Sequence, residues 1–157
     1  MSDYQEVYTR NAPRVYRLCY SRLGNREDAE DAVQNVFVRW LKNGTQFETA
    51  EHEKAYFLRA ASNECINVRS SFWRTKRVDF EDIPEPSSDD SMPEEPGAIL
   101  RSIPAKYREV LYLFYYEELS SEEIAETLSR NHSTVRTQLQ RGRELLKKAL
   151  EKSNEED

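Results

Sequence analysis

The chain has few of the residues on which catalytic and metal sites are usually built. Its 157 residues include two cysteines, two histidines and four glycines. Cys19 and Cys65 are far apart in the sequence, with no CxxC pair and no histidine at metal-ligand spacing, which favours buried free thiols over a redox or metal site. His52 and His132 are the only histidines, and the sequence has neither a glycine-rich phosphate loop nor a GxSxG nucleophile elbow. We therefore expect no catalytic residues, no metal and no cofactor.

Long hydrophobic runs are also missing, and four glycines are too few for a sheet with many turns. No stretch approaches the roughly 18 consecutive apolar residues of a membrane span. The polar, acidic N-terminus does not resemble a signal peptide, so we expect a cytoplasmic protein without membrane insertion. Hydrophobic residues make up 38% of the chain and charged residues 33%, which suits small helical bundles with thin cores. The expected fold class is all-α.

Charge is distributed unevenly, within a formal net charge of −6. Residues 1–78 carry 13 basic and 10 acidic side chains, and residues 98–152 carry 10 and 8. Residues 79–97 carry 8 acidic side chains, no basic one and four prolines, so they cannot form a packed core. We predict two small helical bundles, 1–78 and 98–152, joined by an acidic flexible linker at 79–97 and followed by a frayed tail at 153–157. Neither bundle is basic enough to hold DNA tightly, so a larger partner is expected to supply much of the binding.

The segment from Leu119 to Lys148 predicts two short helices that meet at a tight turn. Ser120 and Glu123 form a capping-box pair at the start of the first helix, and Asn131 can cap the second. Apolar residues recur at helical spacing, namely Ile124, Ala125, Leu128, Val135, Leu139, Leu146 and Leu150. Gly142 falls on the same face, where a missing side chain lets two helices approach closely.

The outward face of the second helix is polar and basic. Helix-turn-helix proteins place the N-terminal residues of their second helix against base edges in the major groove, where Arg, Gln, Ser and Thr supply donors and acceptors. The predicted DNA-reading residues are His132, Ser133, Arg136, Thr137, Gln140 and Arg143. The alternative is a solvated helix whose cations complement the helix dipole, which applies most to Lys147 and Lys148.

Residues 1–78 predict three helices. Residues 4–22 form the first, which Pro13 either starts or kinks, and Gly24 and Asn25 end it and cap the next. Residues 27–42 predict an amphipathic helix with an apolar stripe of Ala29, Val33, Val36, Phe37 and Trp40. The opposite face, with Asp28, Asp31, Gln34, Asn35 and Val38, is either a solvated surface or a docking patch for another helix.

A loop from Gly44 to Thr49 precedes a third helix, expected from about Glu51 to Phe72. This helix and the SFWRTKR run at 71–77 mix aromatic rings with basic and amide groups. Such mixtures suit single-stranded nucleic acid, because bases stack on rings while cations track phosphates. Rings on helices are more often core, so we expect Tyr56, Phe57 and Phe72 to be buried, while Trp73 fits either role.

Beyond the linker the sequence predicts a short helical turn and then a longer helix. The turn spans Ile99 to Ile103, and Pro104 is expected in the first turn of the helix that follows. The expected core residues of that helix are Val110, Leu111, Leu113 and Phe114.

Three segments, taken in order, carry a resemblance to a known family. They are DAEDAVQNVFVRW at 28–40, AYFLRAASNECINV at 55–68 and IPAKYREVLYLFYYEELSSEEIAETLSRNHSTVRTQLQRGRELLKK at 103–148. They resemble the D-A-E-D-x-x-Q-x-x-F, A-W-L-x-x-x-A-x-N-x-x-x-D and L-P-x-x-x-R-E-V to T-V-x-x-x-L-x-R-x-R segments of bacterial RNA polymerase sigma factors. The chain is thus similar to the extracytoplasmic-function (ECF) group of the sigma-70 family, with its second and fourth regions joined by a linker.

The resemblance implies a sigma factor that binds core RNA polymerase and directs promoter-specific transcription initiation, melting the minus-ten region and reading the minus-thirty-five region. The implied polymerase-binding residues are Asp31, Gln34, Asn35 and Val38. The implied minus-ten residues are Arg59, Asn63, Asn67, Arg69, Arg74 and Lys76, and residues in the 44–50 loop would help to hold an extruded base. The predicted DNA-reading residues of the helix-turn-helix, together with Thr134 and Arg141, would face the minus-thirty-five element. The acidic linker would thread the nucleic-acid channel of the polymerase.

The sequence departs from the family pattern at a few positions. Tyr56 and Phe57 replace the usual Trp and Leu, Asn67 replaces Asp, Ser133 replaces a common Gly, and Gly142 replaces a common Ala. The expected partners are core RNA polymerase, promoter DNA and an anti-sigma factor, with the free chain monomeric.

Two other functions also fit the residues. One is a free-standing helix-turn-helix transcriptional regulator that binds duplex DNA without polymerase, with residues 1–78 as a dimerisation or sensing bundle. The other is an adaptor whose helices bind only proteins, for which Arg136→Ala and Gln140→Ala would leave function intact.

Overall fold

The computed structural model describes residues 3–76 and 102–155, and within these the side chains of residues 3–67 and 102–152. The chain divides into two compact units, Met1–Ser87 and Ser88–Asp157. The described residues form helices and no strand, which confirms the all-α prediction. The predicted linker at 79–97 and most of the predicted turn from Ile99 to Ile103 lie outside the described residues, although Ile103 itself is buried. None of the described helices is both long enough and apolar enough to cross a membrane.

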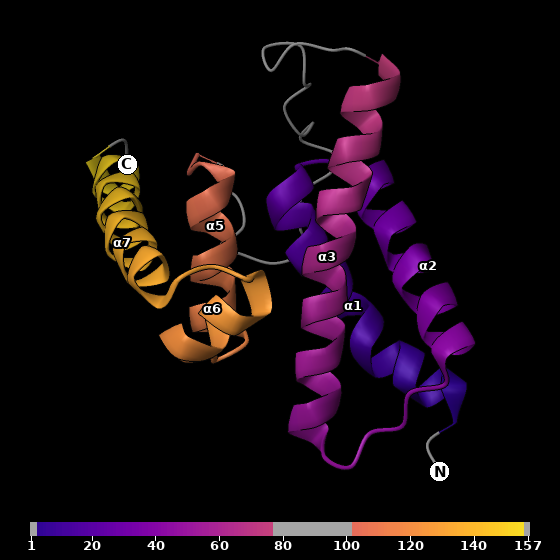
Figure 1. Cartoon of the computed structure of the whole chain (residues 1–157). Coiled ribbons are helices and arrows are strands. Elements are labelled where there is room, and N and C mark those ends of the chain that lie inside the picture. Colours follow the sequence, from indigo (N-terminus) through magenta and orange to yellow (C-terminus); the bar gives the residue numbers. More distant parts are fainter. Residues whose placement is uncertain (1–2, 77–101, 156–157) are drawn as a thin grey trace. The chain divides into compact units, whose positions relative to one another are not determined.

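The first unit is a bundle of α1 (Tyr4–Leu23), α2 (Arg26–Asn43) and α3 (Ala50–Lys76), and each helix packs against the other two (Figure 1). Gly24 ends α1 and Gly44 ends α2, both in the left-handed region at φ 80° and 67°. A glycine adopts this conformation without a steric penalty from a Cβ atom. These two turns set the lengths of the helices and reverse the chain direction between them.

Helix boundaries in this unit follow the predictions in part. The Asn25 side chain accepts a 2.8 Å hydrogen bond from the Asp28 N–H and so caps α2, as predicted. Pro13 lies inside α1, which is continuous, so it does not start the helix. Helix α3 continues to Lys76, four residues beyond the predicted end at Phe72.

Aromatic rings form much of the core of the first unit. The predicted apolar stripe of α2 is buried throughout, and Phe37 stacks on Phe57 with ring centroids 5.0 Å apart. Phe57 is fully buried as predicted, whereas Tyr56 is half-buried and lies against Phe47. The predictions for Phe72 and Trp73 fall on side chains outside the described residues. Trp40 donates a 3.0 Å hydrogen bond from Nε1 to the Thr45 carbonyl, which anchors the loop after α2 to the core.

A buried polar contact joins α1 to α3. The Glu53 carboxylate accepts bonds from Arg10 Nε at 2.6 Å, Arg10 Nη2 at 2.9 Å and Asn11 Nδ2 at 2.6 Å. The bond from Arg10 is the main reason why the pKa of Glu53 lies below its usual range. Burial alone would raise this pKa, so the hydrogen bonds outweigh desolvation.

The second unit contains α5 (Ala105–Leu111), the π-helical turn η3 (Tyr112–Tyr116), α6 (Ser121–Leu128) and α7 (His132–Glu155). Helix α5 packs on α7, and α6 packs on both α7 and η3. Pro104 is the N-cap of α5 rather than a residue of its first turn, because its ψ of 146° is extended and its carbonyl accepts bonds from Tyr107 and Arg108. The predicted single helix is therefore an α-helix followed by a π-helical turn.

The helix-turn-helix forms as the pattern predicts. Ser120 and Glu123 make both bonds of the capping box, and the Asn131 carbonyl accepts the first helical bond of α7 from Val135. At Gly142, an added Cβ would lie 3.1–3.3 Å from three side-chain atoms of Leu111. The predicted close approach of two helices is therefore between α5 and α7.

Three predictions for the core of this unit need correction. Phe114 is half-buried rather than core, because the π-helical turn rotates it toward the edge of α7. Leu150 is 43% exposed and Leu146 is half-buried, because the part of α7 beyond the contact of Gly142 with Leu111 is less covered by the rest of the unit. Helix α7 also continues to Glu155, into the segment predicted as a tail.

Candidate polymerase and nucleic-acid interfaces

The turn between α6 and α7 positions the candidate DNA-reading face. Ser129 adopts the left-handed conformation at φ 55°, and the Arg130 N–H donates a 2.9 Å bond to the Ala125 carbonyl. The Arg130 side chain then bonds to the buried Glu109 of α5 and, at 2.9 Å, to Gln138 of α7. This pairing fixes α7 against the rest of the unit, and no sequence pattern predicted it.

Most of the predicted DNA-reading residues lie on the exposed side of α7. Those exposed are Ser133, Thr134, Arg136, Thr137, Gln140, Arg141 and Arg143. His132 is half-buried instead, because its Nε2 forms a 2.8 Å hydrogen bond with the Ser121 hydroxyl of α6. Val135 and Leu139 on the opposite side are buried, so the helix presents one polar face.

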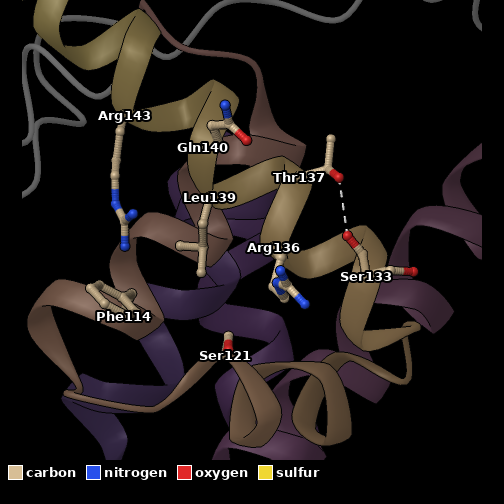
Figure 2. A pocket seen from close by; sticks show the side chains of 8 residues that line it. All are labelled: Phe114, Ser121, Ser133, Arg136, Thr137, Leu139, Gln140 and Arg143. Atoms are coloured by element: carbon tan, nitrogen blue, oxygen red, sulfur yellow. Dashed lines mark hydrogen bonds between the residues drawn. The ribbon is translucent and has the colours of Figure 1, made fainter.

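A hollow of about 550 Å³ brings part of this face together with other elements (Figure 2). Its lining residues are Phe114, Ser121, Ser133, Arg136, Thr137, Leu139, Gln140 and Arg143. Ser121 comes from α6 and Phe114 from η3, and the sequence reasoning assigned neither to the site. Two guanidinium groups, three hydroxyl groups and an amide thus surround one open surface, which suits a ligand rich in hydrogen-bond acceptors and negative charge.

A second exposed face lies along α2. Asp31, Gln34, Asn35 and Val38 are all exposed, and Val38 has 50% of its surface accessible. Leu41, which the sequence reasoning missed, is 54% exposed at the next position of the same helical face. Two exposed aliphatic residues beside an acid and two amides form a surface that suits another helix better than it suits a nucleic acid.

The buried Glu64 of α3 contacts residues of this face. It has 3% of its surface accessible, and its Oε1 accepts a 3.0 Å hydrogen bond from Asn35 Nδ2. Its Oε2 lies 3.2 Å from Arg39 Nη1, an ion-pair contact without hydrogen-bond geometry. Although Asn35 is exposed, its side chain is thus held in place by a buried carboxylate and is not freely solvated.

The candidate minus-ten residues lie along α3. Arg59, Asn63 and Asn67 are exposed and spaced four residues apart, so they share one face of the helix. The helix carries the backbone of Arg69, Arg74 and Lys76, but their side chains lie outside the described residues.

A second hollow, of about 510 Å³, opens at the loop after α2. Its lining residues are Tyr4, Val7, Trp40, Leu41, Gly44, Thr45, Gln46 and Phe47. Tyr4 stacks on Trp40 with ring centroids 5.6 Å apart and planes 14° apart. The structure therefore joins the predicted 44–50 loop to aromatic residues from α1 and α2 that sequence reasoning did not include.

The two cysteines are both free and buried, as predicted. The Cys19 thiol donates a 3.7 Å hydrogen bond to the Ala61 carbonyl. The interaction with the Cys65 thiol, together with burial, raises the pKa of Cys19 well above its usual range. Such a thiol is a poor nucleophile at neutral pH. Across residues 3–76 and 102–155, no three His, Cys, Asp or Glu side chains are grouped as metal ligands would be.

Comparisons with known families match most of the chain. The family model for sigma-70 region 2 matches residues 7–77, and that for sigma-70 region 4 matches residues 97–146.

Individual relatives carry the same description. The ECF RNA polymerase sigma factor SigW of Bacillus subtilis is 32% identical, over 95% of this chain and 88% of that protein. The ECF RNA polymerase sigma factor SigE of Mycolicibacterium smegmatis is 31% identical over 99% of this chain, which spans 65% of that longer protein.

A solved structure shares the fold. It is that of the sigma factor RpoE from Bartonella quintana, determined in complex with the anti-sigma factor NepR. The match has a TM-score of 0.73 at 19% sequence identity and covers 96% of this chain and 98% of that one.

Proposed function

Because this chain belongs to the ECF group of the sigma-70 family of RNA polymerase sigma factors, we propose that it binds core RNA polymerase and directs promoter-specific transcription initiation. The observation that carries the proposal is the exposed polar face of α7, which lies opposite a buried stripe at Val135 and Leu139. The second helix of a helix-turn-helix presents its N-terminal turns to the major groove of DNA.

Helix α7 reads the minus-thirty-five element in this proposal. Arg136 and Gln140 have the side chains that pair with base edges, and Ser133 lies one turn before Arg136. His132 acts differently from its neighbours, because its bond to Ser121 orients the start of α7 rather than leaving the ring free for a base.

Helix α2 docks on the polymerase. Its face of Asp31, Gln34, Asn35 and Val38 combines exposed aliphatic area with hydrogen-bonding groups, as helix-docking surfaces do. Leu41 extends the same face and belongs to the docking surface as well.

Helix α3 and the loop after α2 act on the opened minus-ten element. Arg59, Asn63 and Asn67 line one face of α3 and supply donors to strand backbone and base edges, and Arg69, Arg74 and Lys76 extend the same role. The hollow at Trp40 and Phe47 has aromatic walls and a volume of about 510 Å³, which fits an unstacked base.

The chain has two domains and several partners in this proposal. Domains at 1–78 and 98–152 are joined by an acidic linker, whose 19 residues would span roughly 25 Å as a coil and roughly 60 Å when extended. The chain acts in the cytoplasm as a non-catalytic subunit, is monomeric when free and is held inactive by an anti-sigma factor. The solved complex of Bartonella quintana RpoE with NepR supports this last partner by analogy.

The decisive experiment is run-off transcription with purified core polymerase and promoter DNA selected from a random pool. Start-site-specific transcripts that require the chain would support the proposal, and the enriched sequences would define the promoter. If the chain does not bind core but retains selected duplex DNA by itself, it is a free-standing regulator. If it binds core and Arg136→Ala and Gln140→Ala change nothing, it is a protein-binding adaptor.

A further inference from the structure

One arginine of α7 is held by aromatic residues from an element far away in the sequence. The Arg143 guanidinium carbon lies 4.8 Å from the ring centroid of Phe114 and 6.0 Å from that of Tyr115. Arg143 Nε also donates a 3.1 Å hydrogen bond to the Tyr115 hydroxyl. Figure 2 shows Arg143 extending from α7 toward the Phe114 ring, at one edge of the hollow.

The π-helical turn η3 creates this arrangement. The Glu117 N–H bonds to the Tyr112 carbonyl at 3.2 Å, five residues back, so the turn is wider than an α-helical one. Tyr112 stabilises the turn by stacking on Tyr116 and by donating a 2.8 Å hydrogen bond to Glu117. Phe114 and Tyr115 then stand edge to face, with centroids 5.0 Å apart, and form two walls beside one cation.

The contact holds the arginine without neutralising it. A carboxylate in the same place would cancel the positive charge, whereas aromatic faces and a phenol hydroxyl attract the cation and leave its charge available. The bond to Tyr115 uses Nε, so it leaves the two Nη groups, which can bind two oxygens of a phosphate in parallel. An exposed arginine normally loses side-chain conformational entropy when it binds a ligand. Because these contacts already restrict Arg143 in the free chain, less entropy is lost on binding.

The position of Arg143 on α7 indicates its target. It lies seven residues after Arg136 on the same face, about 10 Å further along the helix axis. When the first turns of a recognition helix enter the major groove, side chains about two turns later meet the edge of the groove, where the phosphate backbone lies.

We propose that Phe114 and Tyr115 are positioning residues that hold Arg143 ready to clamp a backbone phosphate of the minus-thirty-five duplex. Arg143 then sets the register of α7 on the DNA, and Arg136 and Gln140 read bases within that register. This inference rests on the proposed sigma function and adds the two aromatic residues and the ligand class to it.

The test uses the full chain with core polymerase and measures promoter binding over a range of salt concentrations. The variants are Tyr115→Phe, Arg143→Ala and the double variant, with Tyr116→Phe as the matched control from the same turn. Tyr115→Phe keeps the ring and removes only the hydroxyl of a residue that is 56% exposed, so the fold is preserved. Circular dichroism and core-binding affinity are measured for every variant.

Arg143→Ala is expected to weaken promoter binding about tenfold, equally for all promoter sequences. It should also reduce the slope of log K against log salt by about one, the value for a single lost phosphate contact. Tyr115→Phe is expected to weaken binding about threefold when Arg143 is present, and to have no effect when Arg143 is already alanine. Tyr116→Phe should bind as the unaltered chain does.

Three results would overturn the inference. In one, Tyr115→Phe has the same effect with and without Arg143, which shows that the two residues act independently. In another, Arg143→Ala changes the preference at one base pair, which makes it a base-reading residue. In the third, Tyr115→Phe weakens core binding, which makes η3 a polymerase contact. If the unaltered chain forms no promoter complex with core, the proposed function fails and this inference fails with it. If the unaltered chain forms normal complexes and Tyr115→Phe does not change promoter binding, only this inference is rejected.

Discussion

Single residues at the helix-turn-helix divide into those on the proposed DNA-reading face and those that hold α7 in place. Arg136 and Gln140 are exposed on the polar face, and Arg130 connects α7 to the buried Glu109 of α5. We expect a substitution in the first group to change DNA recognition, and one in the second group to change the position of the whole helix.

For the exposed group we expect Arg136→Ala and Gln140→Ala each to weaken recognition by about 1–3 kcal/mol at the promoter position where a base contact is lost. Competition between single-base promoter variants for the polymerase complex would measure this loss. Lys147→Ala is the matched control, because that exposed cation lies beyond the reading face and should affect all sequences equally. A uniform loss from Gln140→Ala would contradict base reading by this residue.

The close contact at Gly142 predicts a graded response to side-chain size. Gly142→Ala gains helix propensity of about 1 kcal/mol but displaces Leu111 by a few tenths of an ångström, so we expect a net change within about 1 kcal/mol. Gly142→Val forces a branched side chain against Leu111 and is expected to destabilise the second unit by about 1–3 kcal/mol. Urea unfolding followed by circular dichroism would test both, and a valine variant as stable as the unaltered chain would show that α5 and α7 can separate freely.

Glu53 predicts a pH dependence in the first unit. Its folded pKa is lowered mainly by the bond from Arg10, so its contribution to stability is present above the unfolded pKa of about 4.3 and is lost as pH falls through the folded value. At pH 7, Glu53→Gln should reduce the free energy of unfolding by about 1 kcal/mol, a modest value because Arg10 is half exposed. The difference between the two proteins should shrink at pH values below about 4. Unfolding followed by tryptophan fluorescence would measure it, and a difference that persists unchanged at low pH would exclude the ion pair as its cause.

At the scale of elements, α2 is shaped by its two faces. The inner face packs aromatic rings against α1 and α3, and the outer face carries the proposed docking residues. Asn35 belongs to both environments, because it is exposed yet bonded to the buried Glu64. The position of the docking face therefore depends on α3 as well as on α2.

We expect Gln34→Ala and Val38→Ala each to weaken core polymerase binding by about 1–2 kcal/mol, with little change in α-helical content. Arg26→Ala is the control, since Arg26 is exposed on the first turn of α2, before the docking residues, and its Nε pairs with Glu30 of the same helix. Fluorescence titration of core polymerase with labelled chain would give the affinities. Equal losses from Arg26→Ala and Gln34→Ala would point to a non-specific effect of altering the helix.

At the scale of the whole molecule, charge explains why the chain should depend on polymerase. The net charge of −6 combines two mildly basic segments with two acidic ones, at 79–97 and 153–157, so few phosphates can be neutralised by the chain alone. We expect the free chain to bind promoter duplex only weakly, with a Kd on the order of 10⁻⁴–10⁻⁶ M at physiological salt. Fluorescence anisotropy with and without core would measure the difference, and tight, sequence-specific binding by the free chain would favour the free-standing regulator.

The sequence by itself determined the helical fold, the two-unit organisation and the family. Local signals sufficed for these features: Gly24 and Asn25 mark a helix boundary, the capping box at Ser120 starts α6, and apolar residues at helical spacing identify the buried faces. Such signals depend on neighbours within a few residues, so they can be read along the chain.

Only the tertiary structure decided which distant residues complete each site. The π-helical turn places Phe114 and Tyr115 against Arg143 of α7. Glu64 of α3 supports Asn35 of α2, and Tyr4 of α1 stacks on Trp40 of α2. Each of these contacts joins separate helical elements. Helical periodicity fixes which face a residue occupies on its own helix, but it carries no information about which residue of another helix lies opposite. That choice is made by close packing, as at Leu111 and Gly142, and packing is a property of the folded chain.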